Sequence, residues 1–293
     1  MNDIKNLVKI RSGLLQELRN YLLERSYVEV STPKISFMPT DQDDHLFGVS
    51  YFGNPAYLVQ TPQFYKQGYV FNGIDSVFEI GPVFRAEPRV TKRHLSEFSS
   101  LDVESIEFTS LDKLMDFEED LLREVTGRLS EKYEIEPLKS FEVVSYKDAQ
   151  KLLSLDSSEP IVNVHEQELT DAVGKDGVFL RDYPSNERVF YYEDERGVSV
   201  SYDLIARGLE ITSGGVRKTL KEKLIESMKR DGIDYSRYGP YLSMFNSKIQ
   251  SHGGFGLGIE RLISRLLFIE DIANVAPYTK KPNTNEESLE WKQ

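Results

Sequence analysis

Apolar residues recur with helical spacing in two stretches of the chain. Within residues 7–25 and 111–129 they fall near one face of a helix. They are Leu7, Ile10, Leu14, Leu18, Tyr21 and Leu22 in the first stretch, and Leu111, Leu114, Met115, Leu121, Leu122, Val125 and Leu129 in the second. This spacing predicts two amphipathic helices. A short β-branched run around Val28 and Val30 follows the first helix and ends at Pro33.

A pair of strands is predicted between residues 77 and 104. Its segments are a strand at residues 77–80 and 83–84, a basic loop at 89–93 and a partner strand at 98–104. Because side chains alternate across a strand, Arg85 and Glu87 share one face, as do Phe98, Asp102 and Glu104. A buried face with a guanidinium and several carboxylates is costly unless a charged ligand or metal compensates it. The strand pair therefore predicts a binding site.

The rest of the chain completes a mixed fold. Its segments are short elements with acidic loops at residues 141–195, strand residues at 198–211, an amphipathic helix at 219–229, a helix beginning at glycines at 258–267, and a polar tail at 281–293. Strands interleaved with segregated helices indicate an α+β architecture, in which helices cover an antiparallel sheet. We predict a single domain over residues 1–280, with an insertion at about residues 141–195.

Composition narrows the classes of protein. A chain of 293 residues with 39% hydrophobic residues can bury a sizeable core, and the lack of cysteine excludes disulfides and thiolate metal sites. No apolar run reaches the roughly 18 to 20 residues of a membrane span, and the N-terminus lacks the layout of a secretion signal. We therefore expect a cytoplasmic protein without membrane contact.

The formal net charge of -12 argues against nonspecific adhesion to nucleic acid, which depends on clustered Lys and Arg. This charge does not exclude tRNA as a partner. A local basic group with Arg85, Arg89, Lys92 and Arg93 can bind an acceptor end or a triphosphate inside an acidic protein.

The strand pair, written FEIGPVFRAEPRVTKRHLSEFSSLDVE at residues 78–104, resembles motif 2 of the class II aminoacyl-tRNA synthetases, in the form used by the aspartyl and asparaginyl enzymes. Four further segments resemble the same family. They are RSGLLQELRNYLLERSYVEVSTPKIS at 11–36 (motif 1), YLVQTPQFYKQ at 57–67 (the amino-acid-binding segment), SYDLIARGLEITSGGVR at 201–217 (the segment before motif 3) and GGFGLGIERL at 253–262 (motif 3). One such motif alone is a weak signal, whereas five in order are a strong one.

The resemblance implies the class II antiparallel sheet, a single catalytic domain and an ATP-dependent, AMP-forming ligase. It also implies a homodimer, because motif 1 builds the subunit interface of that family from its long helix and following strand. Without the resemblance, residues 7–25 are a plain surface helix packed on its own core.

The resemblance assigns a set of residues to ATP: Arg85, Glu87, Arg93, His94, Leu95, Phe98, Glu210, Gly258 and Arg261. Arg85 would hold the α-phosphate and the amino-acid carboxylate, and Arg261 would complete the clamp. These two arginines are the catalytic candidates, because attack on the α-phosphorus requires charge on the phosphates to be neutralised. Taken singly, Arg85 is better explained by an ion pair with Glu87 or Glu104.

The other positions divide between the base and the outer phosphates. Glu87 and the Leu95 backbone would lie near the adenine, and Phe98 would stack on it, although core packing explains an isolated phenylalanine. Arg93 and His94 would lie by the β- and γ-phosphates. The glycines of motif 3, Gly254, Gly256 and Gly258, would let the backbone approach the nucleotide closely.

Asp203 and Glu210 suit a magnesium site, because hard oxygen ligands bind Mg²⁺ and the cation bridges phosphate oxygens. Their odd spacing would place them on opposite faces of one uninterrupted strand. We expect a turn at residues 206–208 to bring both into the site. Outside the resemblance, the two are ordinary solvated acids of an acidic protein.

Lys66 and Arg217 match the positions that bind the aspartate side chain in aspartyl-tRNA synthetases, and asparaginyl enzymes generally lack that lysine. A carboxylate needs cationic partners, so aspartate is the expected amino acid. Gln63 and Asp102 would hold its α-ammonium group. Lys66 is otherwise an ordinary surface lysine.

Three segments depart from the family. Motif 1 begins by Arg11, so we expect no N-terminal anticodon-binding domain. The sequence Thr-Asp-Gln-Asp-Asp at residues 40–44 replaces the glycine-rich flipping loop, which leaves substrate closure open. Residues 276–280 replace the Phe-Pro-Arg of the family, so a phosphate-binding cation is missing there or supplied by Lys280.

These features leave three functions. An aspartate-activating ligase that transfers aspartate to ammonia and forms asparagine is modestly favoured. A tRNA ligase without an anticodon domain is the first alternative, and a noncatalytic regulatory paralogue is the second. A regulatory remnant has no chemical need for all five of the motif residues Arg85, Glu87, Asp203, Glu210 and Arg261.

Overall fold

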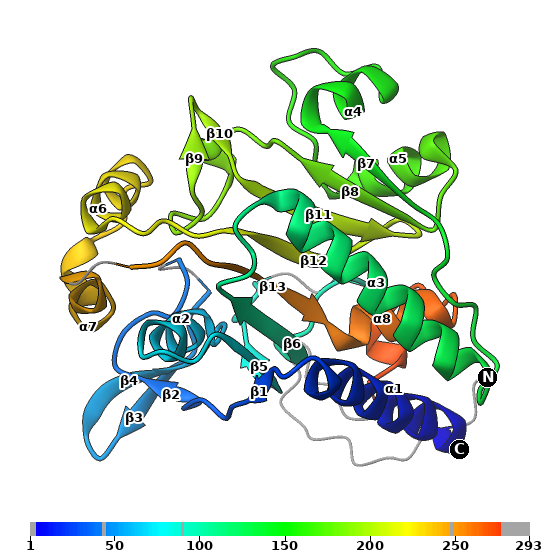
Figure 1. Cartoon of the computed structure of the whole chain (residues 1–293), viewed down its shortest axis with the longest axis horizontal. Helices are drawn as coiled ribbons and strands as arrows, with labels where there is room; N and C mark the ends of the chain where they lie inside the picture. Colours follow the sequence, from blue (N-terminus) through cyan, green and yellow to red (C-terminus); the bar gives the residue numbers. More distant parts are fainter. Residues whose placement is uncertain (1–3, 43–44, 89–90, 247–248, 277–293) are drawn as a thin grey trace.

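The computed structural model describes residues 4–42, 45–88, 91–246 and 249–276. An eight-stranded sheet in the order β1-β5-β6-β13-β12-β11-β8-β7 forms its centre (Figure 1). Its strands are β1 (Val28–Glu29), β5 (Ser76–Phe84), β6 (Glu97–Ser105), β13 (Gly253–Gly258), β12 (Leu209–Val216), β11 (Ser201–Ala206), β8 (Gly177–Arg181) and β7 (Phe141–Ser145). The predicted α+β fold is confirmed. The two edge pairs, β1 with β5 and β7 with β8, are parallel, and the other pairs are antiparallel.

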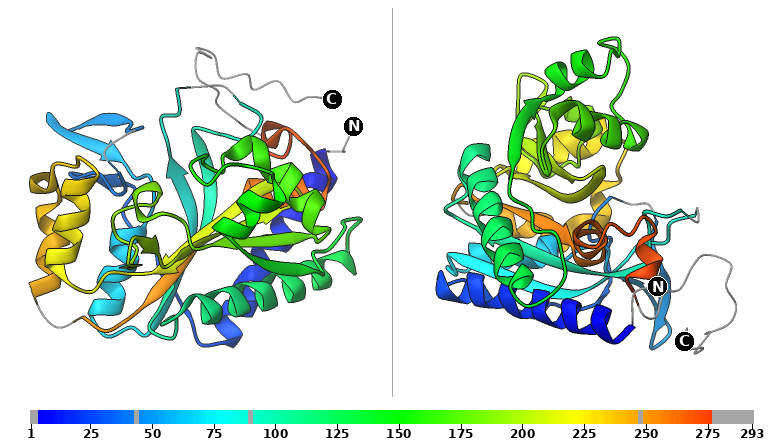
Figure 2. Two further views of the ribbon diagram at one scale, coloured as in Figure 1. Left: turned by 90° about the horizontal axis from the view of Figure 1, so that it is seen from above. Right: turned by 90° about the vertical axis from the view of Figure 1, so that its right-hand side faces the viewer.

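Two long helices lie together along one face of this sheet, α1 (Ile4–Glu24) and α3 (Leu111–Ser130) (Figures 1 and 2). Both were predicted from helical spacing, and their apolar residues are buried in the main core. Ser110 caps α3, because its side chain accepts a hydrogen bond from the Lys113 backbone N–H at 3.4 Å. Helix α8 (Ile259–Leu266) follows β13 and packs against the sheet.

Smaller elements surround the main sheet. The helices are α2 (Gln63–Phe71), α4 (Tyr146–Leu152), α5 (Glu166–Val173), α6 (Lys221–Arg230) and α7 (Gly239–Ser243), and the strands are β2 (Ile35–Ser36), β3 (Gly48–Tyr51), β4 (Asn54–Leu58), β9 (Asp194–Glu195) and β10 (Val198–Ser199). Strands β2, β4 and β3 form a separate three-stranded sheet. The helix predicted at residues 219–229 corresponds to α6. No helix in the described part of the chain is long and apolar enough to cross a membrane.

The predicted insertion at residues 141–195 contributes β7 and β8 to one edge of the main sheet. Helices α4 and α5 of the same segment pack on these strands around a separate apolar cluster that includes Leu169, Leu180 and Ile205. The segment therefore extends the sheet, and its status as an insertion stays a prediction. The predicted tail at residues 281–293 lies outside the described residues.

The predicted strand at residues 198–211 is broken by a two-residue turn. Arg207 and Gly208 both have positive φ, 45° and 78°, which suits a tight hairpin between β11 and β12. Glu210 then lies opposite Ile205, two residues along β11 from Asp203. Both carboxylates therefore lie on one face of the sheet, as the expected turn requires.

Candidate active site

A cavity of about 280 Å³ opens over the central strands β6, β13, β12 and β11. Its lining includes the residues predicted to contact ATP, magnesium or the amino acid, except Lys66 and Gly254. These are Gln63, Arg85, Glu87, Arg93, His94, Leu95, Phe98, Asp102, Asp203, Glu210, Arg217, Gly258 and Arg261. Residues from four of the five motif-like segments thus meet at one place, and the segment at 11–36 contributes none of them.

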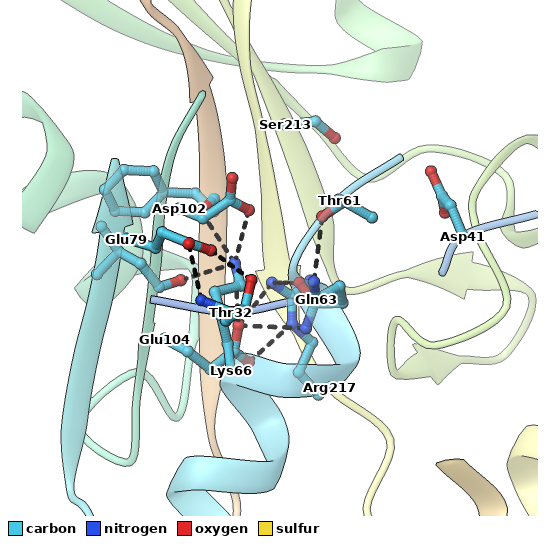
Figure 3. Close-up of polar contacts among 12 residues, drawn as sticks. Thr32, Asp41, Thr61, Gln63, Lys66, Glu79, Asp102, Glu104, Ser213 and Arg217 are labelled. Carbon is cyan, nitrogen blue, oxygen red and sulfur yellow. Dashed lines mark hydrogen bonds and ion pairs between the residues drawn. The ribbon is translucent and has the colours of Figure 1, made fainter. Parts of the chain in front are cut away.

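The end of the cavity at Arg217 has a buried ionic floor. Glu104 accepts hydrogen bonds from Arg217 Nε at 3.0 Å and Nη2 at 3.1 Å, and from Gln63 Nε2 at 3.2 Å (Figure 3). Burial alone would raise the pKa of Glu104, but the charges of Arg217 and Lys66 outweigh it and lower this pKa to about 2. The carboxylate is therefore ionised and holds Arg217 at the cavity wall.

One guanidinium nitrogen of Arg217 donates no hydrogen bond within the protein. Its Nη2 also donates to Gln63 Oε1 at 3.0 Å, whereas Nη1 is buried and has no hydrogen-bond partner. A buried guanidinium donor without a partner costs free energy. Arg217 therefore fits a carboxylate ligand in the cavity.

Lys66 was predicted to contact the amino acid, but it is completely buried and does not line the cavity. Its ammonium group donates to Asp102 Oδ1 at 3.0 Å and to the carbonyls of Val103 at 3.3 Å and Phe255 at 3.4 Å. These acceptors match its three donors. Lys66 therefore supports Asp102 from below and is not an ordinary surface lysine.

Arg85 follows directly after β5, and its backbone N–H donates to the Ser96 carbonyl at 2.9 Å. Its guanidinium lies 5.6 Å from the centre of the Phe98 ring, and its buried Nε has no hydrogen-bond partner. Among the described residues it forms no ion pair with Glu87 or Glu104, so the alternative explanation of this arginine is not supported. Arg85 is available for an anion.

Arg261 lies in the first turn of α8, where its Nη1 donates to Glu210 Oε1 at 3.0 Å and to the Glu210 carbonyl at 2.8 Å. His94 lines the same part of the cavity, and its Nδ1 lies 2.8 Å from Thr91 Oγ1. Burial and the charge of Arg261 lower the pKa of His94, so the imidazole is neutral at pH 7.

The glycines of β13 have more than one role. A Cβ at Gly254 would lie 2.1 Å from the Val103 carbonyl oxygen and 2.4 Å from a carboxylate oxygen of Glu104, so the close approach here is to β6. A Cβ at Gly258 would meet the Arg261 side chain at an ordinary 3.5 Å. Close approach to a nucleotide therefore does not explain Gly254.

The two predicted magnesium ligands are both paired with arginines. Asp203 forms a two-point ion pair with Arg188, with both N···O distances 2.7 Å, and Glu210 pairs with Arg261. No group of three or more His, Cys, Asp or Glu side chains in the described residues is arranged to hold a metal ion. Mg²⁺ commonly binds through one or two carboxylates plus substrate phosphates. Asp203 and Glu210 therefore suit a Mg²⁺ that binds together with a nucleotide, and not one held by protein ligands alone.

Sequence reasoning missed two residues of this region. Arg188 lines the cavity and lies 4.4 Å from the Tyr183 ring centre in addition to its pair with Asp203. Glu166, on α5, accepts a hydrogen bond from Arg93 Nη2 at 2.5 Å. No local pattern marks either residue, because each partner lies far away in the sequence.

The two altered segments are described in part. Thr40 Oγ1 accepts from the Gln60 backbone N–H at 2.9 Å, and Asp41 Oδ1 accepts from Tyr191 at 3.2 Å, so the start of the altered loop is anchored at the cavity. Asp43 and Asp44 lie outside the described residues, as do residues 277–280 with Lys280.

Comparison with known proteins gives a consistent set of relatives. The family model described as tRNA synthetases class II (D, K and N) matches residues 1–282. The chain is 36% identical to an aspartate–tRNA(Asp) ligase of Pyrococcus abyssi, over 93% of this chain and 67% of the relative. It is 35% identical to an aspartate–tRNA(Asp/Asn) ligase of Thermus thermophilus, over 90% and 67%. The chain thus spans about two thirds of these curated relatives.

The similar solved structures are also aspartyl- and asparaginyl-tRNA synthetases. Asparaginyl-tRNA synthetase from Pyrococcus horikoshii, complexed with asparaginyl-adenylate, superimposes with a TM-score of 0.86 at 27% identity, over 95% of this chain and 69% of that one. Aspartyl-tRNA synthetase from Entamoeba histolytica gives 0.80 at 28% identity, over 92% and 57%.

Proposed function

Because the chain belongs to the class II tRNA synthetases of the D, K and N group, a family of ATP-dependent ligases, we propose that it activates aspartate with ATP. A carboxylate oxygen of aspartate attacks the α-phosphorus, pyrophosphate leaves, and aspartyl-adenylate forms. The observation that carries the proposal is the presence of four buried guanidinium nitrogens without a hydrogen-bond partner, Arg85 Nε, Arg93 Nε, Arg188 Nε and Arg217 Nη1, on residues that line one cavity.

Strand β12 separates the two parts of the site. Glu210 lies near its start and Arg217 just after its end, so the two are roughly 20 Å apart along an extended strand. Arg85, Arg261 and His94 would receive the phosphates, with Glu210 and Asp203 toward a Mg²⁺ that neutralises phosphate charge when bound. Arg217 would receive a carboxylate of the amino acid, and Asp102 its ammonium group.

The two possible acceptors require different carboxylates of aspartate to be activated. Ammonia gives asparagine only if it attacks the activated side-chain carboxylate and displaces AMP. A tRNA hydroxyl gives aspartyl-tRNA by attacking the activated α-carboxylate. We favour ammonia, and a tRNA ligase is the alternative that the names of the relatives support. In either reaction Arg217 would bind the carboxylate that is not activated.

The deciding experiment incubates the protein with aspartate, ATP and Mg²⁺, and adds either ammonium or total tRNA. We expect asparagine, resolved from its α-amide isomer by chromatography, in the ammonium sample. Efficient charging of tRNA without asparagine would favour the alternative. Wild-type protein that catalyses no aspartate-dependent exchange of pyrophosphate into ATP would contradict both.

We further propose a homodimer in the cytoplasm. Three apolar residues of α1 and β1 are exposed in the single chain, Val8 at 47%, Leu23 at 52% and Val28 at 46%, and they suit an interface between two copies. Sedimentation equilibrium should give twice the chain mass of 33.7 kDa. A monomer at micromolar concentration would contradict this proposal.

A further inference from the structure

Glu166 joins two phosphate-facing segments that are far apart in the sequence. It is the first residue of α5, and it is 5% exposed. Its Oε1 accepts from Arg93 Nη2 at 2.5 Å, and its Oε2 accepts from the Glu210 backbone N–H at 2.6 Å. One buried carboxylate therefore contacts both the loop of motif 2 and the start of β12.

Arg93 is held at two points by the same part of the molecule. Its Nη1 donates to the Asn163 carbonyl at 3.1 Å, next to the Glu166 contact. A long arginine side chain in an open loop has many rotamers, and each contact with a fixed partner removes some of them. Arg93 therefore reaches the cavity in an orientation that residues 163–166 determine.

The contacts continue to the next cation of the site. Glu210, whose backbone Glu166 holds, pairs through its side chain with Arg261 on α8. Arg93, Glu210 and Arg261 all line the main cavity, whereas Glu166 does not. Glu166 instead lines a second cavity of about 170 Å³, which shares Arg188, Asp203 and Glu210 with the main cavity.

A carboxylate at the start of a helix has a simpler explanation, because it stabilises the positive end of the helix dipole. That role does not require burial or these two partners. Glu168, in the same first turn, is exposed and has the same charge.

We infer that Glu166 is a positioning residue for ATP, which holds Arg93 and the start of β12 in the arrangement that receives the β- and γ-phosphates. The inference rests on the proposed function, since it takes the phosphates to bind at Arg93. It gives residues 141–195 a part in nucleotide binding.

A double-mutant cycle tests it, with Glu166→Gln, Arg93→Ala and the double variant. Glutamine keeps an oxygen for the Glu210 N–H and removes the charge that holds Arg93. Calorimetry should give ATP binding weakened on the order of tenfold by Glu166→Gln, with no further loss when it is added to Arg93→Ala. In pyrophosphate exchange the KM for ATP should rise while the KM for aspartate stays unchanged.

Glu168→Gln is the matched control and should leave ATP affinity at the wild-type value, and thermal unfolding checks that all variants fold. Equal loss in both backgrounds would overturn the inference, because Glu166 would then act independently of Arg93. Tighter ATP binding by Glu166→Gln would also overturn it, because Glu166 would then compete with phosphate. If the ATP affinities agree with the cycle but the wild type catalyses no aspartate-dependent exchange, the proposed function is refuted and the inference on Glu166 is not.

Discussion

Arg217 and Glu104 form a completely buried two-point ion pair at the floor of the cavity, with Nε 3.0 Å from Oε1 and Nη2 3.1 Å from Oε2. Lys66 lies 3.6 Å from the same carboxylate. Glu104 thus balances two buried cations and fixes the guanidinium that would bind the amino acid. One side chain therefore supports both the buried charges and the proposed contact with the amino acid.

Replacing Glu104 by glutamine should destabilise the fold by about 3 to 5 kcal/mol, because buried Arg217 would lose its compensating carboxylate and Lys66 would keep only Asp102. Denaturant unfolding at pH 7 measures the change. Glu107→Gln is the matched control, since Glu107 is exposed two residues beyond β6 and should cost less than about 0.5 kcal/mol. A loss below about 1 kcal/mol for Glu104→Gln would show that the pair contributes little.

Aspartate should bind more tightly than asparagine. An amide in place of the carboxylate leaves the buried Arg217 Nη1 poorly compensated, which should cost at least roughly 1 to 3 kcal/mol. Calorimetric titration of each amino acid beside a nonhydrolysable ATP analogue measures the difference. Equal affinities, or tighter binding of asparagine, would remove the argument for aspartate.

Arg85→Ala and Arg261→Ala should each slow the activation of aspartate on the order of 10²- to 10³-fold, because each removes a donor that stabilises charge on the phosphates. The assay is aspartate-dependent exchange of pyrophosphate into ATP. Arg230→Ala is the control, since this exposed residue of α6 lies outside the cavity lining. Full activity of either cavity variant would contradict the assignment.

Glu118 on α3 should contribute a stability that falls as pH rises from about 4.5 to about 7. Burial raises the pKa of its carboxyl to about 7, and Tyr202 donates a hydrogen bond to Oε2 at 2.6 Å. Between about 4.5 and about 7 the folded state keeps a proton that the unfolded state releases. The free energy of unfolding therefore falls with pH by up to roughly 1.4 kcal/mol per unit, and levels off above pH 7.

Urea unfolding at several pH values between 5 and 8 tests this dependence. Glu118→Gln cannot ionise and should flatten the curve in this range. Asp116→Asn, an exposed position of the same helix, should leave the slope unchanged. Equal slopes for the wild type and Glu118→Gln would contradict the assignment, because buried groups with a lowered pKa, such as His94, act in the opposite direction in both proteins.

Local patterns of the sequence determined much of this protein. Helical spacing located α1 and α3, and strand alternation located the β5–β6 pair that places Arg85, Phe98 and Asp102 on the cavity. These features depend on the periods of helix and strand, which a single segment contains. The five ordered motifs then brought distant segments together as one predicted site, and almost all of their candidate residues line one cavity.

Tertiary structure decided what depends on how elements dock. Arg93 meets Glu166 across 73 residues of sequence, and Asp203 meets Arg188 from a separate segment. Lys66 lies outside the cavity lining because its ammonium group donates hydrogen bonds to Asp102 and to two backbone carbonyls of neighbouring strands. The parallel edge strands β1 and β7 likewise depend on the neighbours they meet. No period within one segment encodes such contacts, because they arise only when the whole chain packs.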